Sequence, residues 1–89
     1  MEHELKLWVQ SWYAIHDGSK TWEARVDDRG FEVGDVLVLH PYEPDLMVYV
    51  EEMHDLVVKV THKQTFGMAD GFVGLSFQLL TKCSCKEAV

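Results

Sequence analysis

The feature that most constrains this fold is a period-two alternation of apolar and polar residues, repeated in short runs along a chain of 89 residues. Residues 55–64 alternate so that Leu56, Val58 and Val60 share one face, and residues 72–80 alternate in the same way. Successive side chains of a β-strand point to opposite faces, so such runs are typical of strands with one buried face. The pattern therefore predicts a protein built mainly from short strands.

Further segments suit strands of the same sheet. They are residues 3–9, 19–26, 36–40 and, less regularly, 46–53. The segment 36–40 reads VLVLH and is almost wholly apolar, which is consistent with burial on both of its faces. Pro41 and Pro44 are expected to break the chain directly after it.

One segment, residues 9–18, changes the period of the apolar residues from two to about four. Trp8, Trp12 and Ile15 are spaced three or four residues apart, which is typical of the apolar stripe of a short helix. Gly18 can adopt the left-handed conformation that often follows a helix. We interpret the stripe as part of the core rather than as a cofactor site.

Five to six short strands and one early helix define the predicted fold class, which is mainly β (α+β). In so short a chain, a small, mostly antiparallel β-barrel best provides the strands with hydrogen-bonding neighbours, because closing the barrel removes the sheet edges. The helix is expected at one opening of the barrel. We expect a single domain over residues 1–82 and a frayed tail over residues 83–89. Cys83 and Cys85 are interpreted as reduced thiols in that tail, with a metal or redox role as the alternative.

The charge of the chain is unevenly distributed. The formal net charge of -7 argues against nonspecific nucleic-acid binding, because such binding is driven by lysine and arginine on phosphates. Half of the eight basic residues nevertheless lie in the first third of the sequence. These are Lys6, Lys20, Arg25 and Arg29. Residues 41–58, by contrast, hold five acidic residues and no lysine or arginine. A protein that is acidic overall can still present one basic face.

The sequence contains no sign of a membrane or metal association. No apolar run approaches the roughly 20 residues that span a bilayer, and no signal-peptide pattern opens the chain. We therefore expect a soluble, cytoplasmic protein without membrane contact. The histidines are scattered along the sequence, so we predict neither a metal site nor a cofactor. The oligomeric state is left open.

The strand predicted over residues 19–26 carries the most chemistry. Alternation assigns Trp22, Ala24 and Val26 to the core. The opposite face is a polar row of Thr21, Glu23 and Arg25. Two interpretations of this row remain open: Glu23 and Arg25 form a plain structural ion pair, or they contact a ligand.

Three motifs extend this pattern. They are H-x-L-K at His3–Lys6, G-x-K-T-x-E-x-R at Gly18–Arg25, and D-R-x-F-x-V-G-D-x-L-x-L at Asp28–Leu39. With the closing FGMADGFVGLSF, they make residues 3–80 resemble the ASCH-type domains of the PUA-like superfamily, in particular a short phage and bacterial group. The resemblance implies a PUA-like β-barrel with a short helix after the first strand. It also implies RNA or nucleotide binding in the cleft between that helix and the barrel, beside G-x-K-T.

Carried onto this chain, the resemblance predicts a ligand site around the G-x-K-T segment. Gly18 would let the backbone approach a ligand, Lys20 would reach a phosphate, and Arg25 would offer a planar fork. Glu23 would accept a hydrogen bond from the amino group of a base. Further predicted members are His3, Lys6, Thr21, Arg29 and Trp12, the last as a stacking face together with Trp8 or Tyr13.

Two other functions compete with this binding module. A related branch of the ASCH group hydrolyses the amide of N4-acetylcytidine with a lysine, a threonine three residues later, and a glutamate. Lys20 matches that lysine, but Glu23 stands at the threonine position, and Glu51 and Glu52 are only the nearest candidates for the acid. The third possibility is that the acidic residues 41–58 bind a protein partner.

Overall fold

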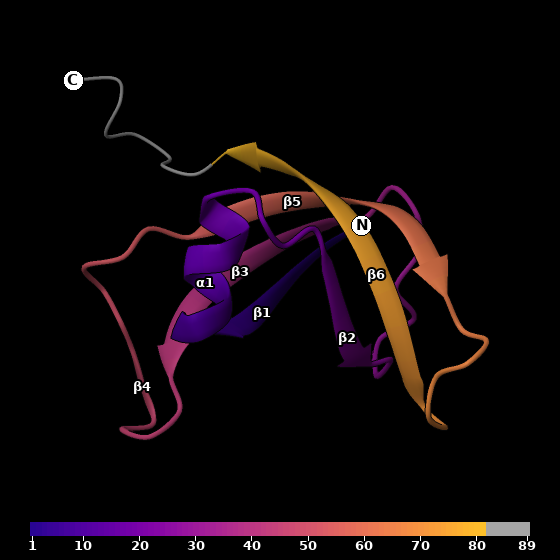
Figure 1. The fold of residues 1–89 in the computed structure, drawn as a ribbon, viewed down its shortest axis with the longest axis horizontal. Coiled ribbons are helices and arrows are strands. Elements are labelled where there is room, and N and C mark those ends of the chain that lie inside the picture. Colours follow the sequence, from indigo (N-terminus) through magenta and orange to yellow (C-terminus); the bar gives the residue numbers. More distant parts are fainter. Residues whose placement is uncertain (82–89) are drawn as a thin grey trace.

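The computed structural model describes residues 1–81, which form one curled β-sheet with a short helix (Figure 1). The elements are β1 (Glu2–Trp8), α1 (Val9–His16), β2 (Trp22–Val26), β3 (Val36–Glu43), β4 (Val48–Tyr49), β5 (Leu56–Gln64) and β6 (Phe72–Thr81). The predicted class, mainly β with one short helix after the first strand, is thereby confirmed. The predicted tail with Cys83 and Cys85 lies outside the described residues.

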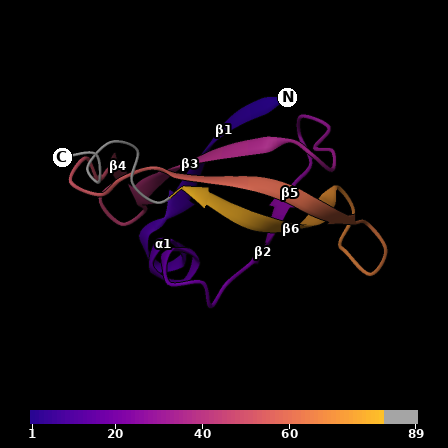
Figure 2. The same ribbon diagram turned by 90° about the horizontal axis from the view of Figure 1, so that it is seen from above.

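The strands follow the order β1-β3-β5-β6-β2, and β4 is added to β3. Only the β1–β3 pair is parallel among these pairings, and the others are antiparallel. Seen from above, β1, β3, β5 and β6 succeed one another, while α1 and β2 lie on the far side (Figure 2). The expectation of a barrel closed by strand pairing is wrong for the described residues. There β1 and β2 are the two edges of the sheet, and we call the gap between them the seam.

The core lies inside the curl of the sheet. Its buried side chains come from every second position of the long strands and from one face of the helix: Leu5, Leu7, Leu37, Leu39, Leu56, Val58, Val60, Val73, Leu75 and Phe77, with Trp12, Ile15 and Phe31. The faces predicted for β5 and β6 are confirmed. Trp8 does not belong to the helical stripe, because it ends β1 and points to solvent.

The region around β3 and β4 corrects two expectations. Pro41 does not break the chain but lies within β3 opposite Leu7, and its carbonyl accepts a hydrogen bond from the N–H of Val50 at 3.0 Å. Only one face of β3 is fully buried, not both. The strand predicted over residues 46–53 is reduced to the two residues of β4. They belong to a projecting arm, residues 44–53, here named the β4 arm (Figure 1).

The strand β2 has the predicted alternation with its faces exchanged. Glu23 and Arg25 are half-buried, whereas Trp22, Ala24 and Val26 are exposed. The indole of Trp22 packs over Gly74 of β6, where an added Cβ would stand 2.5 Å from a ring carbon. The apolar face of β2 is thus part of the outer face of the sheet, and its charged face points towards the seam. Among residues 1–81, no helix is long and apolar enough to cross a bilayer.

Candidate functional site

Two arginine side chains span the seam. Arg25 of β2 donates from Nη2 to the carbonyl oxygen of Lys6, and Arg29 donates from Nη1 to that of Glu4 at 3.0 Å. Carbonyl groups two residues apart point to the same side of a strand, so these two belong to the edge of β1 that has no strand partner within residues 1–81. Edges of this kind need other partners. The curled sheet is therefore closed at this point by side chains instead of a backbone ladder.

Glu23 lies at the centre of the charged face of β2. Its Oε1 is 2.9 Å from Nζ of Lys20, and its Oε2 is 3.5 Å from Nη2 of Arg25. The first contact lacks the angles of a hydrogen bond, so Oε1 is a buried acceptor with no hydrogen-bond donor among the described residues. Coulombic attraction to the ammonium of Lys20 therefore holds this buried oxygen in place.

Lys20 is positioned by the turn that ends α1. Gly18 has φ +88 and its N–H bonds to the carbonyl of Ile15, which confirms the predicted helix end. The backbone N–H of Lys20 then bonds to the carbonyl of Ala14 at 3.0 Å. From there the ammonium group reaches back to the helix and donates to Oγ of Ser11 at 3.2 Å.

Burial lowers the pKa of Arg25, and the charge of Arg29 acts in the same direction, whereas the carboxylate of Glu23 opposes the shift. Arginine nevertheless keeps its proton in proteins, so the guanidinium is a permanent cation inside a partly desolvated gap. A cation in such a place interacts more strongly with an anionic ligand than one in open solvent.

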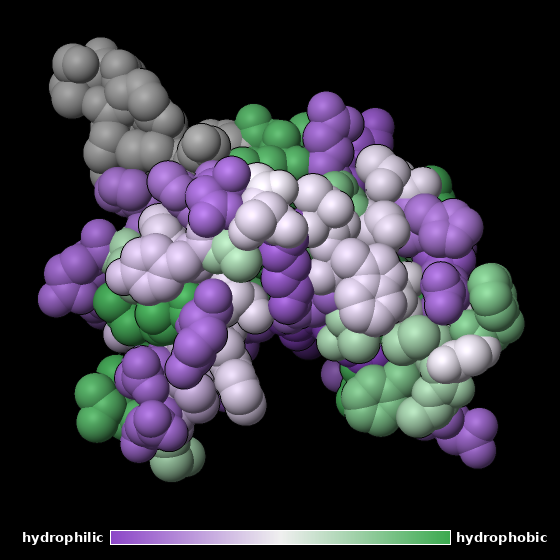
Figure 3. All heavy atoms as spheres, viewed as in Figure 1, coloured by the Kyte–Doolittle hydropathy of each residue, from purple (hydrophilic) through white to green (hydrophobic). Residues whose placement is uncertain are grey.

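These side chains line a hollow of about 600 Å³ between β1, α1 and β2, which we name the seam cleft. Its charged members are Lys6, Lys20, Arg25, Arg29, Glu23 and Asp28. Half of the chain's eight basic residues thus meet here with only two of its fifteen acidic ones. Figure 3 shows this face of the molecule hollowed between the β4 arm and the ends of β2 and β6.

The rim of the seam cleft is apolar. Trp8, Trp22 and Phe72 line it and are 58%, 40% and 43% exposed. Exposed aromatic rings beside cations are the usual means of holding unpaired bases. Trp22 and Phe72 were missed in the sequence, because alternation assigned Trp22 to the core and a single phenylalanine carries no signal of its own.

Five of the nine predicted site residues line the seam cleft: Lys6, Lys20, Glu23, Arg25 and Arg29. Gly18 and Thr21 do not line it. Gly18 serves the helix end, and the carbonyl of Thr21 accepts the N–H of Phe77 at 3.0 Å.

His3 and Trp12 lie in the interior, so the expectation that they face a ligand is corrected. The Nε2 atom of His3 lies 2.9 Å from Oδ2 of Asp35, and both side chains are buried. The pKa of Asp35 is lowered, chiefly by this hydrogen bond and then by that from the N–H of Glu32. The indole of Trp12 donates to the carbonyl of His54 at 2.7 Å and offers no face to a base. His3 is buried because odd positions of β1 face the core, whereas Lys6 points outward.

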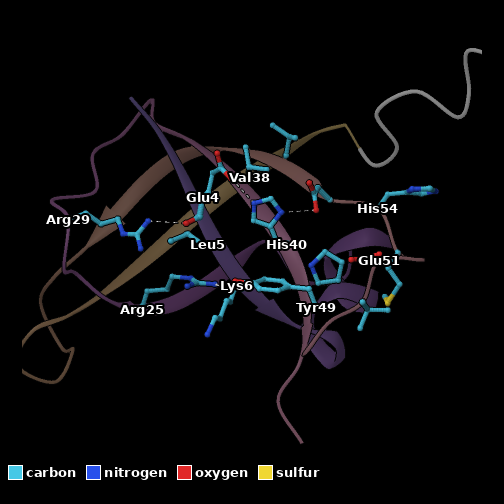
Figure 4. Close-up of a pocket in the computed structure, with 15 residues that line it drawn as sticks. Glu4, Leu5, Lys6, Arg25, Arg29, Val38, His40, Tyr49, Glu51 and His54 are labelled. Carbon is cyan, nitrogen blue, oxygen red and sulfur yellow. Dashed lines mark hydrogen bonds and ion pairs between the residues drawn. The ribbon is translucent and has the colours of Figure 1, made fainter. Parts of the chain in front are cut away.

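A second hollow, of about 940 Å³, lies on the outer face of β1 and β3 beneath the β4 arm, and we name it the outer hollow (Figure 4). At its centre His40 lies between two carboxylates, with Nε2 2.9 Å from Oε1 of Glu4 and Nδ1 2.9 Å from Oδ1 of Asp55. Partial burial disfavours the charged ring, but the hydrogen bonds and charges of both partners outweigh it and raise the pKa of His40. The sequence assigned no role to this histidine.

The acidic residues 41–58 are divided between two environments. The segments at either end belong to β3 and β5 and alternate in burial, whereas the β4 arm between them exposes Asp45, Glu51 and Glu52. The arm also exposes Leu46 and Met47, at 71% and 75%. A protein-binding role of the arm stays a prediction. No group of three or more potential metal ligands occurs within residues 1–81.

The fold and the site together define a small, mainly β domain with one helix and a basic, aromatic-rimmed cleft at an open edge of its sheet. More particularly, the chain belongs to the family described as a domain of unknown function, DUF3850, which matches residues 2–77. No curated protein matches the chain.

Proposed function

We propose that this protein is an ASCH-type, PUA-like domain that binds RNA or a nucleotide in the seam cleft. The observation that carries the proposal is the gathering of half of the basic residues of an acidic chain around one cleft with exposed aromatic rings on its rim. Basic side chains contact phosphates and aromatic rings stack on bases, so the two together suit an unpaired nucleotide.

Each group of the cleft has a role in this proposal. Lys6, Lys20 and Arg29 meet the phosphate, while Arg25 supports it from the floor of the cleft. The carboxylate of Glu23, whose side chain is 18% exposed, accepts a hydrogen bond from the amino group of a base. Trp8 and Trp22 supply the stacking faces. The acidic remainder of the surface repels polyanions elsewhere and so limits nonspecific binding.

The test is a titration of tryptophan fluorescence with short single-stranded RNAs at low and moderate salt. Lys20→Ala removes a cleft cation that makes no contact across the seam, and we expect roughly tenfold or weaker affinity. Lys59→Ala is the matched control, because Lys59 is exposed on β5 and lines neither hollow. Equal affinity in both variants, or the absence of saturable quenching, would contradict the proposal.

A second candidate function, hydrolysis of an acylated nucleoside such as N4-acetylcytidine, is favoured by one contact. The related hydrolases have a threonine where this chain has Glu23. The hydroxyl of Ser11 lies 3.2 Å from the ammonium of Lys20, so Ser11 supplies the cleft with a hydroxyl in place of that threonine. In such a reaction Ser11 attacks the acyl carbon, the C–N bond breaks, the amine leaves with a proton, and water releases the acyl group. Acetate release that disappears in Ser11→Ala would support it. The donation from Lys20 to Ser11 suits binding better, because an ammonium group cannot accept the hydroxyl proton.

A further inference from the structure

The seam cleft and the outer hollow adjoin each other. Leu5, Lys6, Arg25 and Arg29 line both of them. Three of these four are cations, and they stand where one hollow passes into the other, over the edge of β1. Figure 4 shows Arg25 and Arg29 entering the outer hollow from one side, Lys6 and His40 near its middle, and Glu51 and His54 on the opposite side.

The two hollows together exceed what one nucleotide needs. A pocket of about 300–1,000 Å³ holds one small ligand. The seam cleft, at about 600 Å³, and the outer hollow, at about 940 Å³, each fall within that range. A mononucleotide in the seam cleft would therefore leave the outer hollow vacant.

Aromatic and cationic side chains also follow one another in the order that a single nucleic-acid strand requires. Trp8 and Trp22 lie at the seam end, the shared cations lie in the middle, and Tyr49 lines the outer hollow with 52% of its surface exposed. A nucleic-acid strand presents base, phosphate and base in the same order. The nearby carboxylates of Glu4 and Asp55 both contact the ring of His40, which when protonated offsets one of their two negative charges.

We propose that the ligand is a flexible single strand of at least two to three nucleotides. It stacks one base at the seam cleft, lays a phosphate over Lys6, Arg25 and Arg29, and places a further base against Tyr49 in the outer hollow. This inference rests on the proposed function and specifies the length and course of its ligand. A single strand can bend over the edge of β1, which a stiff duplex does not do without a large deformation energy.

The test is a length series with cytidine 5′-monophosphate and oligocytidylates of two to six nucleotides, at one fixed salt concentration. We expect affinity to rise about tenfold or more between one and three nucleotides and then to level off, since each further stacked base strengthens binding until the aromatic rings are occupied. Tyr49→Ala should remove this gain and leave the affinity for the mononucleotide unchanged. Tyr13→Ala is the control, because Tyr13 is a similarly exposed tyrosine, at 60%, that lines neither hollow.

The outcomes separate this inference from the function on which it rests. Binding that is independent of length, or a length gain that survives in Tyr49→Ala, overturns the inference and leaves nucleotide binding in the seam cleft intact. Failure of every ligand, including the mononucleotide, to bind overturns both. Circular dichroism of Tyr49→Ala and Tyr13→Ala verifies that both variants are folded.

Discussion

At the scale of single residues, Arg25 and Arg29 make the same kind of bond from different environments. The Arg25 side chain is 20% exposed and that of Arg29 is 40% exposed. Removing Arg25 leaves the carbonyl of Lys6 without its side-chain donor in a partly desolvated gap and leaves the carboxylate of Glu23 with Lys20 as its remaining ion-pair partner. Removing Arg29 exposes the carbonyl of Glu4 to water, which can replace the lost hydrogen bond.

We therefore expect Arg25→Ala to lower the free energy of unfolding by about 2 kcal/mol and Arg29→Ala by about 0.5–1 kcal/mol. Arg25→Lys should recover only part of the loss, since an ammonium group lacks the planar fork. Urea denaturation measures all three, with Lys59→Ala as a surface control expected within about 0.5 kcal/mol of the parent. An Arg25→Ala protein as stable as the control would show that the seam does not depend on this bond.

His40 makes stability depend on pH through its two carboxylate partners. Its pKa is raised in the folded protein, so its contribution is fully present below the ordinary histidine value of about 6.5 and is lost as pH rises through the folded pKa. His40→Gln should accordingly destabilise the protein more at pH 6 than at pH 9. The measurement is the urea midpoint of parent and variant at both values. A larger difference between the two urea midpoints at pH 9 than at pH 6 would contradict a positive charge on His40 in the folded protein.

At the scale of elements, β2 depends on a close contact between its outer face and β6. The ring of Trp22 occupies the space that a side chain at Gly74 would need. Gly74→Ala should displace the indole, change the tryptophan emission and lower the free energy of unfolding by about 1 kcal/mol.

Gln78→Ala is the matched control for that change, because Gln78 is exposed on the same face of β6. The cost of Gly74→Ala should also shrink in a Trp22→Leu background, where the ring is absent. If the cost persists there, the contact with Trp22 is not its cause.

The same element shows how far the sequence could predict the fold. The faces of β5 and β6 follow from alternation because each has paired neighbours in the sheet, so one face must enter the core. Within residues 1–81, β2 pairs with β6 alone, and Arg25 on its charged face bonds to the carbonyl of Lys6, 19 residues away. No local pattern contains that partner, so alternation predicted the period of β2 and assigned its faces wrongly.

The candidate site was predictable to a similar extent. Glu23 and Arg25 share one face because they are two residues apart on one strand, whereas Lys20 precedes β2 and reaches the same cleft from the turn after α1. His3 and Lys6 were assigned together as members of one motif, but an odd separation along a strand places them on opposite faces. The outer hollow depends on the β4 arm folding over β3, which no motif indicates.

At the scale of the whole molecule, the net charge of -7 and the basic cleft respond to salt in opposite ways. Added salt screens the self-repulsion of an acidic protein, so thermal stability should rise modestly with sodium chloride. The affinity for single-stranded RNA should fall, with a slope of about -2 in a plot of log K against log salt if three cations meet phosphates. Calorimetry and fluorescence titration in the same buffers measure both trends, and an affinity independent of salt would contradict phosphate contact.

The arginine-bridged seam has a consequence for how such a domain can vary. The circumference of a closed barrel follows from its number of strands and their stagger, so it changes only in discrete steps. Here two side chains bridge β1 and β2 by hydrogen bonds instead. Substitutions at positions 25 and 29 could therefore widen or narrow the opening in small increments while every strand keeps its register. A scaffold of this kind can be adapted to ligands of different width by changing two residues.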